Sequence, residues 1–304
     1  MKRLLLIMFV ILCIPLPLFA DEVDDALPMD TPARIKESAR QVIKVGVENH
    51  GVIKMTQTML ENNFREQQIL EAHEILMEAR RANLPEEPIM DKLHEGVAKQ
   101  VGTESIIQAM ERVRSRYETA SRYAFRYSED GEQARVMTRE IAECMTAGMG
   151  EGDIDRIMEM LQKRELKRDE AADLATETFK TARTMALTGV ESRNIADVVD
   201  NAFQRGYTAG EIEKLGNAFM IHARTSSSPS DLAESYSSAI RRGLTADSLM
   251  ESDLFISGGS NGFGAGGSEN SGGLGNIGGS GGFGGISGSG GSSGSGGGGR
   301  GGRR

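Results

Sequence analysis

The chain has 304 residues, of which 38% are hydrophobic, and a formal net charge of −9 at pH 7. The span 21–256 holds 43 acidic and 30 basic residues, which argues against nucleic acid and anionic membrane surfaces as partners of the folded part. Of the two cysteines, one lies within the first twenty residues. If those residues are removed, Cys144 is the one thiol left, so an apolar core supplies the stability without an intramolecular disulfide. We expect Cys144 to be a small buried residue rather than to pair between chains.

The first twenty residues have the layout of a secretory signal peptide. Lys2 and Arg3 precede an apolar run over 4–14, and two prolines follow it before Ala20. The run is short for a membrane span, and an uncleaved anchor is the alternative. We therefore expect cleavage of the 1–20 segment after Ala20, an acidic leader over 21–30, and a mature protein without a stable membrane span. Its expected location is the periplasm, the cell surface or the extracellular medium.

One sequence pattern recurs through the middle of the chain. A Gly or Asn is followed by an apolar residue, and further apolar residues come about 5, 8 and 12 or 13 positions later. The apolar first residues of the pattern are Val47, Phe64, Leu84, Val101, Met149, Leu166, Val190, Tyr207 and Leu244. Gln100 and Glu165 are the two cases in which Gly or Asn does not precede that residue. The pairs 47/64, 84/101, 149/166 and 190/207 are each seventeen residues apart.

The end of one helix and the start of the next explain this pattern. Gly and Asn readily adopt the left-handed conformation that ends a helix, and the following apolar residue packs back over its last turn. A capping box at Thr208 and Glu211 predicts the start of one new helix, and Thr103, Ser192 and Thr245 are further candidate N-caps. Seventeen residues therefore correspond to one short amphipathic helix and its turn.

These signals predict an all-α domain over roughly 31–254, with about ten to thirteen helices and no strand. A longer helix is expected over 106–127, with a break at 128–133. Irregular helical-hairpin repeats that stack like an α-solenoid are favoured over a compact helical bundle, because each hairpin needs neighbours to cover its apolar stripe. The tetratricopeptide signature is excluded, since the chain contains no Trp.

The C-terminal segment 257–304 has a different composition. It holds 25 of the 38 glycines, together with isolated large apolar residues. Such a segment cannot bury enough apolar surface to offset its backbone entropy, so we expect a disordered Gly/Ser-rich tail. Its basic end carries Arg300, Arg303 and Arg304. We expect it to act as a tether, and self-association through it is a further hypothesis.

No motif in the chain specifies a reaction. Asp91 and His94 are three residues apart, which places both on one helical face and resembles part of a carboxylate-bundle metal site. However, neither the Glu-x-x-His nor the His-Glu-x-x-His pattern occurs. We therefore predict no catalytic residue, no cofactor and no metal ligand.

An Arg- and Tyr-rich stretch over 114–127 is the one unusual patch in this acidic chain. Arg and Tyr are enriched at binding hot spots, so the stretch is a candidate interaction surface. The alternative is a long helix whose Tyr rings and Arg stems cover neighbouring helices. The predicted surface comprises Arg114, Arg116, Tyr117, Arg122, Tyr123, Arg126 and Tyr127, with Phe125 among them.

Two functions remain open on the sequence alone. The first is an exported, non-enzymatic helical-repeat protein that binds another envelope or extracellular protein. The alternative is a small-ligand or metal-binding protein, or an enzyme, with a concave site near Asp91, His94 and the 114–127 stretch. A weaker third hypothesis is a carbohydrate-associated surface protein that uses the tyrosines as stacking platforms.

Overall fold

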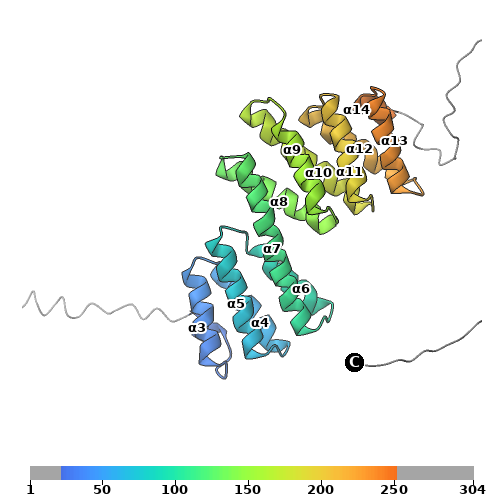
Figure 1. The fold of residues 1–304 in the computed structure, drawn as a ribbon. Helices are drawn as coiled ribbons and strands as arrows, with labels where there is room; N and C mark the ends of the chain where they lie inside the picture. Colours follow the sequence, from blue (N-terminus) through green and yellow to red (C-terminus); the bar gives the residue numbers. More distant parts are fainter. Residues whose placement is uncertain (1–21, 252–304) are drawn as a thin grey trace, which may run out of the picture. The chain divides into compact units, whose positions relative to one another are not determined.

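The computed structural model describes residues 22–251, and every regular element in that range is a helix. The predicted signal peptide 1–20, with Ala20, and the Gly-rich tail 257–304 lie outside the described residues. The thirteen helices within 22–251 are α2 (Glu22–Ala26), α3 (Ala33–Lys44), α4 (Asn49–Glu61), α5 (Glu66–Arg81), α6 (Glu87–Ala98), α7 (Thr103–Tyr127), α8 (Gly131–Ala147), α9 (Glu151–Gln162), α10 (Arg168–Leu187), α11 (Ser192–Gln204), α12 (Ala209–Ala223), α13 (Pro229–Arg241) and α14 (Ala246–Glu251). The all-α prediction is confirmed (Figure 1).

Eight of these helices end in the same hydrogen-bonded turn. After α10, for example, Gly189 has φ +92°, its N–H donates to the Ala186 carbonyl, and the Val190 N–H donates to the Met185 carbonyl. These two bonds are those of a Schellman motif. The residues of 22–251 with positive φ are Gly46, Asn63, Asn83, Gln100, Gly148, Gly189, Gly206 and Gly243. They precede eight of the nine apolar residues with which the sequence pattern begins.

The two exceptions in the sequence pattern behave differently in the structure. Gln100 adopts φ 54° although it is neither Gly nor Asn, and the Val101 N–H donates to the Gly96 carbonyl as at the other turns. Glu165 is not left-handed, and the Leu166 N–H bonds instead to the nearby Arg164 carbonyl. A left-handed turn therefore forms at one of the two positions that lack Gly or Asn, so residue type alone does not decide where it forms.

The apolar residue five positions after each pattern start lies in the core. Val52, Ile69, Ile89, Ile106, Ile154, Ile195, Ile212 and Leu249 are at most 2% exposed. Ala171, which follows the irregular start at Leu166, is the half-buried member of the series. After a regular turn, the next helix therefore starts with its apolar stripe facing the neighbouring helices.

Each helix packs mainly on the helices one and two positions away in the sequence. Contacts link α3 to α5 and α5 to α7, and they link α8 to α10, α10 to α12 and α12 to α14 (Figure 1). A second series links α4 to α6, α9 to α11 and α11 to α13. The order changes once, because α7 packs directly on α8. Up to α7 the first series uses odd-numbered helices, and from α8 onward it uses even-numbered ones.

Polar contacts between next-nearest helices hold this packing in register. Arg156 of α9 pairs with Asp197 at 2.7 Å and with Asp200 at 2.9 Å, both on α11. The Tyr207 hydroxyl after α11 donates to the Leu244 carbonyl after α13 at 2.7 Å. Partners in such contacts lie about two helices apart in sequence, as the packing order requires.

The helix starts are partly as predicted. Thr208 and Glu211 form the predicted capping box at α12, and the Thr245 hydroxyl accepts from the Ser248 N–H at 3.3 Å. Ser192 is not a cap, because α11 already begins there; its hydroxyl donates to Asp153 and accepts from the Gly150 N–H. The predicted helix over 106–127 corresponds to α7, which ends at Tyr127, and α8 starts at Gly131, within the expected break at 128–133.

The acidic leader belongs to the packed region. Helix α2 lies within it, and Val23 and Leu27 are 2% and 3% exposed in the same apolar core as α3. Asp24 pairs with Arg40 of α3 at 2.7 Å. The apolar side chains of the leader therefore pack in the core with α3, while its carboxylates within 22–30 lie at the surface.

We expect Gly206→Ala to lower the free energy of unfolding by about 1–2 kcal/mol, because an L side chain is strained at its φ of +81°. Gly210→Ala is the matched control within the next helix, where an added Cβ meets no neighbour and φ is not positive. It should be neutral or stabilising by up to about 1 kcal/mol. Urea unfolding followed by circular dichroism measures both, and equal effects would contradict the role of the left-handed turn.

Candidate functional site

The four histidines do not form a common site. His73 is fully buried, with Nε2 at 2.9 Å from the Thr56 hydroxyl and Nδ1 at 3.0 Å from the Ser38 hydroxyl. Because the Thr56 hydroxyl donates to the Val52 carbonyl, it accepts from His73 Nε2–H, and the Ser38 hydroxyl donates to Nδ1. Burial lowers the pKa of His73 to about 4. His73 is therefore a neutral residue that joins α3, α4 and α5.

Asp91 and His94 lie on α6 as predicted, but they have different surroundings. Burial, with repulsion from Lys54, lowers the pKa of His94, and Asp91 opposes this shift. Asp91 lines a groove of about 510 Å³ with Arg112, Arg116 and other residues of α6, α7 and α8. His94 is not among the residues that line this groove, which we call the Asp91 groove. Within 22–251, no group of three or more His, Cys, Asp or Glu side chains is placed to hold a metal ion.

The tyrosines of the 114–127 stretch face the protein interior. Tyr117 and Tyr123 are 6% and 8% exposed, and the half-buried Tyr127 donates its hydroxyl to the Ala171 carbonyl at 3.1 Å. Burial, with the nearby Asp155 carboxylate, raises the pKa of Tyr123 to about 12. These rings therefore offer little area to an incoming sugar or protein. The 3- and 4-residue spacing of Met110, Val113, Tyr117, Ala120, Ala124 and Tyr127 is the sequence signal for a buried stripe.

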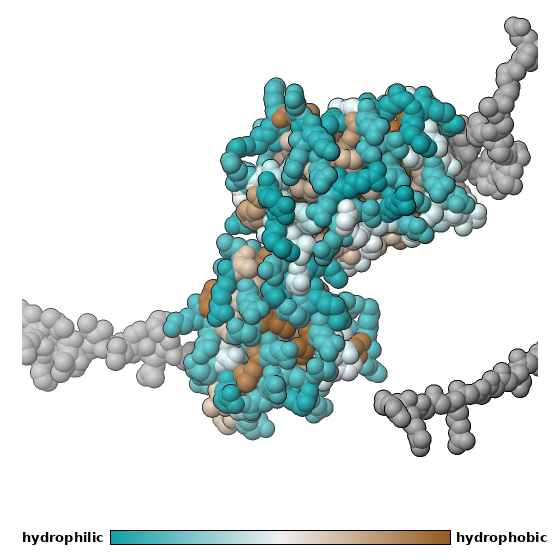
Figure 2. Space-filling model, viewed as in Figure 1, coloured by the Kyte–Doolittle hydropathy of each residue, from teal (hydrophilic) through white to brown (hydrophobic). Residues whose placement is uncertain are grey.

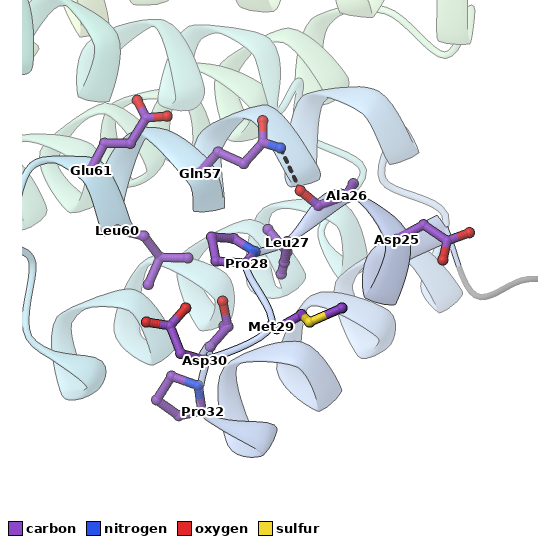
Figure 3. A pocket seen from close by; sticks show the side chains of 11 residues that line it. Asp25, Ala26, Leu27, Pro28, Met29, Asp30, Pro32, Gln57, Leu60 and Glu61 are labelled. Carbon is purple, nitrogen blue, oxygen red and sulfur yellow. Dashed lines mark hydrogen bonds between the residues drawn. The ribbon is translucent and has the colours of Figure 1, made fainter.

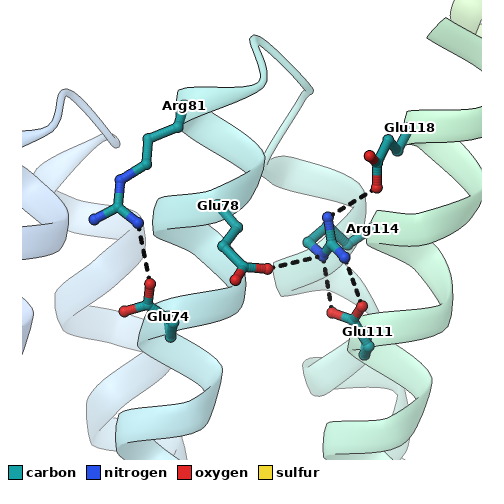
Figure 4. A network of polar contacts seen from close by, with 6 residues as sticks. All are labelled: Glu74, Glu78, Arg81, Glu111, Arg114 and Glu118. Atoms are coloured by element: carbon teal, nitrogen blue, oxygen red, sulfur yellow. Dashed lines mark hydrogen bonds and ion pairs between the residues drawn. The ribbon is translucent and has the colours of Figure 1, made fainter. Parts of the chain in front are cut away.

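The arginines of the stretch divide between internal and exposed positions. Arg114 pairs with Glu78 of α5 and with Glu111 and Glu118 of its own helix, at 3.4, 2.7 and 3.1 Å (Figure 4). These carboxylates raise the pKa of the Arg114 guanidinium. Arg116 donates to the Thr146 hydroxyl of α8 at 2.8 Å. Both residues tie α7 to its neighbours.

Arg122 and Arg126 are exposed on α7, together with Phe125. The Arg126 guanidinium lies 5.6 Å from the centre of the Tyr123 ring. Arg122 donates to the Thr119 hydroxyl at 3.0 Å on the same helix. The predicted stretch thus combines an exposed basic edge with a buried aromatic side, and it is not one continuous surface.

A second groove, which we call the Arg139 groove, lies nearer the C-terminal end of α7 than the Asp91 groove does. It has a volume of about 230 Å³ and is lined by the α5–α6 turn, by Ser121 and Phe125 of α7, and by α8. The α8 residues are Arg135, Thr138 and Arg139. The sequence did not predict this site, because its residues come from three elements and no local motif joins them. Its one sequence signal is the surplus of arginine on neighbouring helices.

A larger groove of about 750 Å³ adjoins the acidic leader. Figure 3 shows Gln57 and Leu60 of α4 facing the 25–32 segment, and Gln57 donates to the Ala26 carbonyl at 2.8 Å. The Thr31 hydroxyl is buried without a hydrogen-bond partner among the described residues. The lining includes the carboxylates of Asp25, Asp30 and Glu61, so an anionic ligand is disfavoured there.

Cys144 is fully buried and its thiol donates to the Phe179 carbonyl at 2.8 Å. Burial raises the pKa of this thiol, which disfavours the reactive thiolate. The prediction that Cys144 is a buried residue is confirmed.

On the face drawn in Figure 2, the described surface is mostly hydrophilic with small separate hydrophobic patches. None of the helices within 22–251 is long and apolar enough to span a membrane.

Comparison of the chain with protein-family models, with curated proteins and with solved structures finds no match.

We expect the stability contributed by His73 to fall as the pH drops from about 6.5 to about 4. The unfolded chain binds a proton at this residue near pH 6.5, whereas the folded protein does so only near pH 4. Between pH 7 and pH 5 this costs about 2 kcal/mol of unfolding free energy. Urea titrations of wild type and His73→Gln at both pH values test it. The variant should lose less stability than wild type, whereas the exposed control His50→Gln should behave like wild type.

We expect Arg114→Met to lower the free energy of unfolding by about 1–3 kcal/mol, because it leaves three carboxylates without their shared cation. Arg122→Met on the same helix removes an exposed guanidinium and should change stability by less than about 0.5 kcal/mol. Thermal and urea unfolding compare the two variants. Similar losses in both would show that the Arg114 network does not join α5 and α7 energetically.

Proposed function

We propose that the protein is an exported, non-enzymatic helical-repeat protein that binds another protein in the cell envelope or outside the cell. The observation that carries this proposal is the packing order, in which every extensive contact among the described helices joins helices one or two positions apart. A compact bundle brings distant helices together around a common centre, whereas an α-solenoid-like stack does not. Eight equivalent turns support the same interpretation.

A stack of this kind suits binding better than catalysis. Neighbouring repeats present side chains on continuous surfaces, and large partners bind to such surfaces through many weak contacts. The thiol of Cys144 is buried, and the hydroxyls of Ser38 and Thr56 contact His73, whose ring is itself fully buried away from any substrate. The chemistry of the described residues therefore favours recognition.

Export is supported by the signal-peptide layout of residues 1–20. Cleavage after Ala20 would leave every helix of the described range, 22–251, complete. Glu22 accepts a hydrogen bond from the Asn49 side chain, which fastens the new N-terminus to α4. The core of buried apolar side chains can stabilise the exported protein without an intramolecular disulfide.

The Gly-rich tail would act as a tether in this function. A flexible Gly/Ser-rich chain of 48 residues has a root-mean-square end-to-end distance of about 35–42 Å. Its basic end would then sample a wide volume around the acidic helical region. A partner that carries two sites could engage both parts and gain avidity.

The second candidate is a small-ligand site in the Asp91 groove. The supporting observation is that Asp91, Arg116 and Tyr117 line the same groove, although they come from two helices. Together they offer a carboxylate, a guanidinium and part of an aromatic ring. A ligand there would need groups that complement both charges.

We expect the exported protein to begin at Asp21. Intact-mass analysis of the protein recovered from its own cells measures this directly. Ala20→Arg should block cleavage, because the site requires a small residue, and the recovered mass should then include the leader. A wild-type protein that retains residues 1–20 would favour the uncleaved anchor instead.

We expect native mass spectrometry of the tagged mature protein, captured from its own cells, to show a stoichiometric protein partner. A matched sample without 257–304 reports whether the tail contributes to capture. A monomer that carries a small molecule would overturn the scaffold function, and its loss in Arg116→Ala would place the molecule in the Asp91 groove.

A further inference from the structure

The Arg139 groove has an unusual charge for this protein. Three guanidinium groups, from Arg80, Arg135 and Arg139, line it together with one carboxylate, from Glu86. Arg80 pairs with Glu86 at 3.3 Å, and Arg135 pairs with Glu132 at 3.5 Å. The surplus of positive charge stands out in a span with 43 acidic and 30 basic residues.

Arg139 carries the positive charge that has no internal partner. Its side chain is exposed, and it forms no hydrogen bond or ion pair with any residue of the described range. An unpaired guanidinium beside a concave surface can bind a carboxylate bidentately. The groove therefore favours a ligand that brings a negative charge.

The same groove also has an apolar side. Phe125 is 48% exposed, although it is a large aromatic residue, and Leu84 and Pro85 lie in the same lining. A volume of about 230 Å³ is suited to one large side chain and not to a whole helix. The matching ligand is thus an extended peptide segment with a carboxylate next to a large apolar side chain.

The chain itself contains such a segment immediately after its last described helix. Residues 251–256 read Glu-Ser-Asp-Leu-Phe-Ile, and 254–256 is the one run of three large apolar residues beyond 251. Glu251 is exposed at the end of α14. We propose that residues 251–256 of one copy dock into the Arg139 groove of a second copy, with Asp253 at Arg139 and Phe255 against Phe125.

The reach of the segment requires a second copy. Helix α14 packs on α12, α12 on α10 and α10 on α8, so the groove is three helix packings away from residue 251. Packed helices are about 8–10 Å apart, which makes about 24–30 Å. Four extended residues from Glu251 to Phe255 span at most about 14 Å. A chain therefore cannot fill its own groove with this segment.

The resulting contact is heterologous, since the two copies use different surfaces. A bound pair leaves one groove free on one copy and one segment free on the other, so copies add in a head-to-tail series that closes into a ring or continues. This goes beyond the proposed function, which concerns a different protein as partner. It also places self-association before the Gly-rich tail rather than within it.

Sedimentation velocity of the mature protein, residues 21–304, tests the proposal over a wide concentration range. We expect wild type to form oligomers that grow with concentration. Arg139→Glu and the double variant Asp253→Arg/Phe255→Ala should each weaken association at least tenfold. Arg193→Glu, an exposed arginine on α11, is the matched control and should associate like wild type. Circular dichroism confirms that every variant is folded.

Mixing the two defective proteins gives the decisive measurement. The Arg139→Glu protein keeps an intact segment, and the segment variant keeps an intact groove, so a mixture should form heterodimers and nothing larger. Native mass spectrometry identifies them by mass. Wild type that stays monomeric, association that persists in Arg139→Glu, or a mixture without heterodimers would each overturn the proposal.

Discussion

The left-handed residue that ends eight of the described helices is the constraint on which the rest of the fold depends. At Gly206, for example, positive φ lets the Tyr207 N–H reach back to the Ala202 carbonyl, which reverses the chain and buries the Tyr207 ring. The next helix then starts at a fixed distance from the turn. Ile212, five positions after Tyr207, is buried in the core for that reason. One backbone conformation thus sets the phase of the following helix.

The sequence predicted this part of the fold because the constraint is local. Gly189 and Gly206 are the residues that adopt positive φ at least cost, and the apolar spacing after them is set by helix geometry. Gln100 shows the limit of such reasoning, since it takes the same conformation without the same preference. Ser192 shows another limit. Its hydroxyl donates to Asp153 and accepts from the Gly150 N–H, and these partners lie about forty residues earlier in the chain, beyond the reach of a local capping pattern.

The candidate sites were harder to predict, since they depend on which helices become neighbours. The direct packing of α7 on α8 brings Arg139 near Phe125, and no spacing in the sequence indicates that step. The interior position of Tyr117 was predictable from its place in the apolar stripe, but its residue type drew attention to binding instead. Residue type suggested the chemistry, whereas helix phase decided which side chains are available for it.

The change of packing order at α7 and α8 has a consequence for cooperativity. In an α-solenoid-like stack, as proposed above, stability is the sum of the stabilities of the units and of the interfaces between neighbours. The α7–α8 contact is the extensive helix pair that joins α2–α7 to α8–α14 among the described residues. The two sets of helices therefore melt together only as far as this interface couples them. A ligand that bridges α7 and α8 would turn two transitions into one.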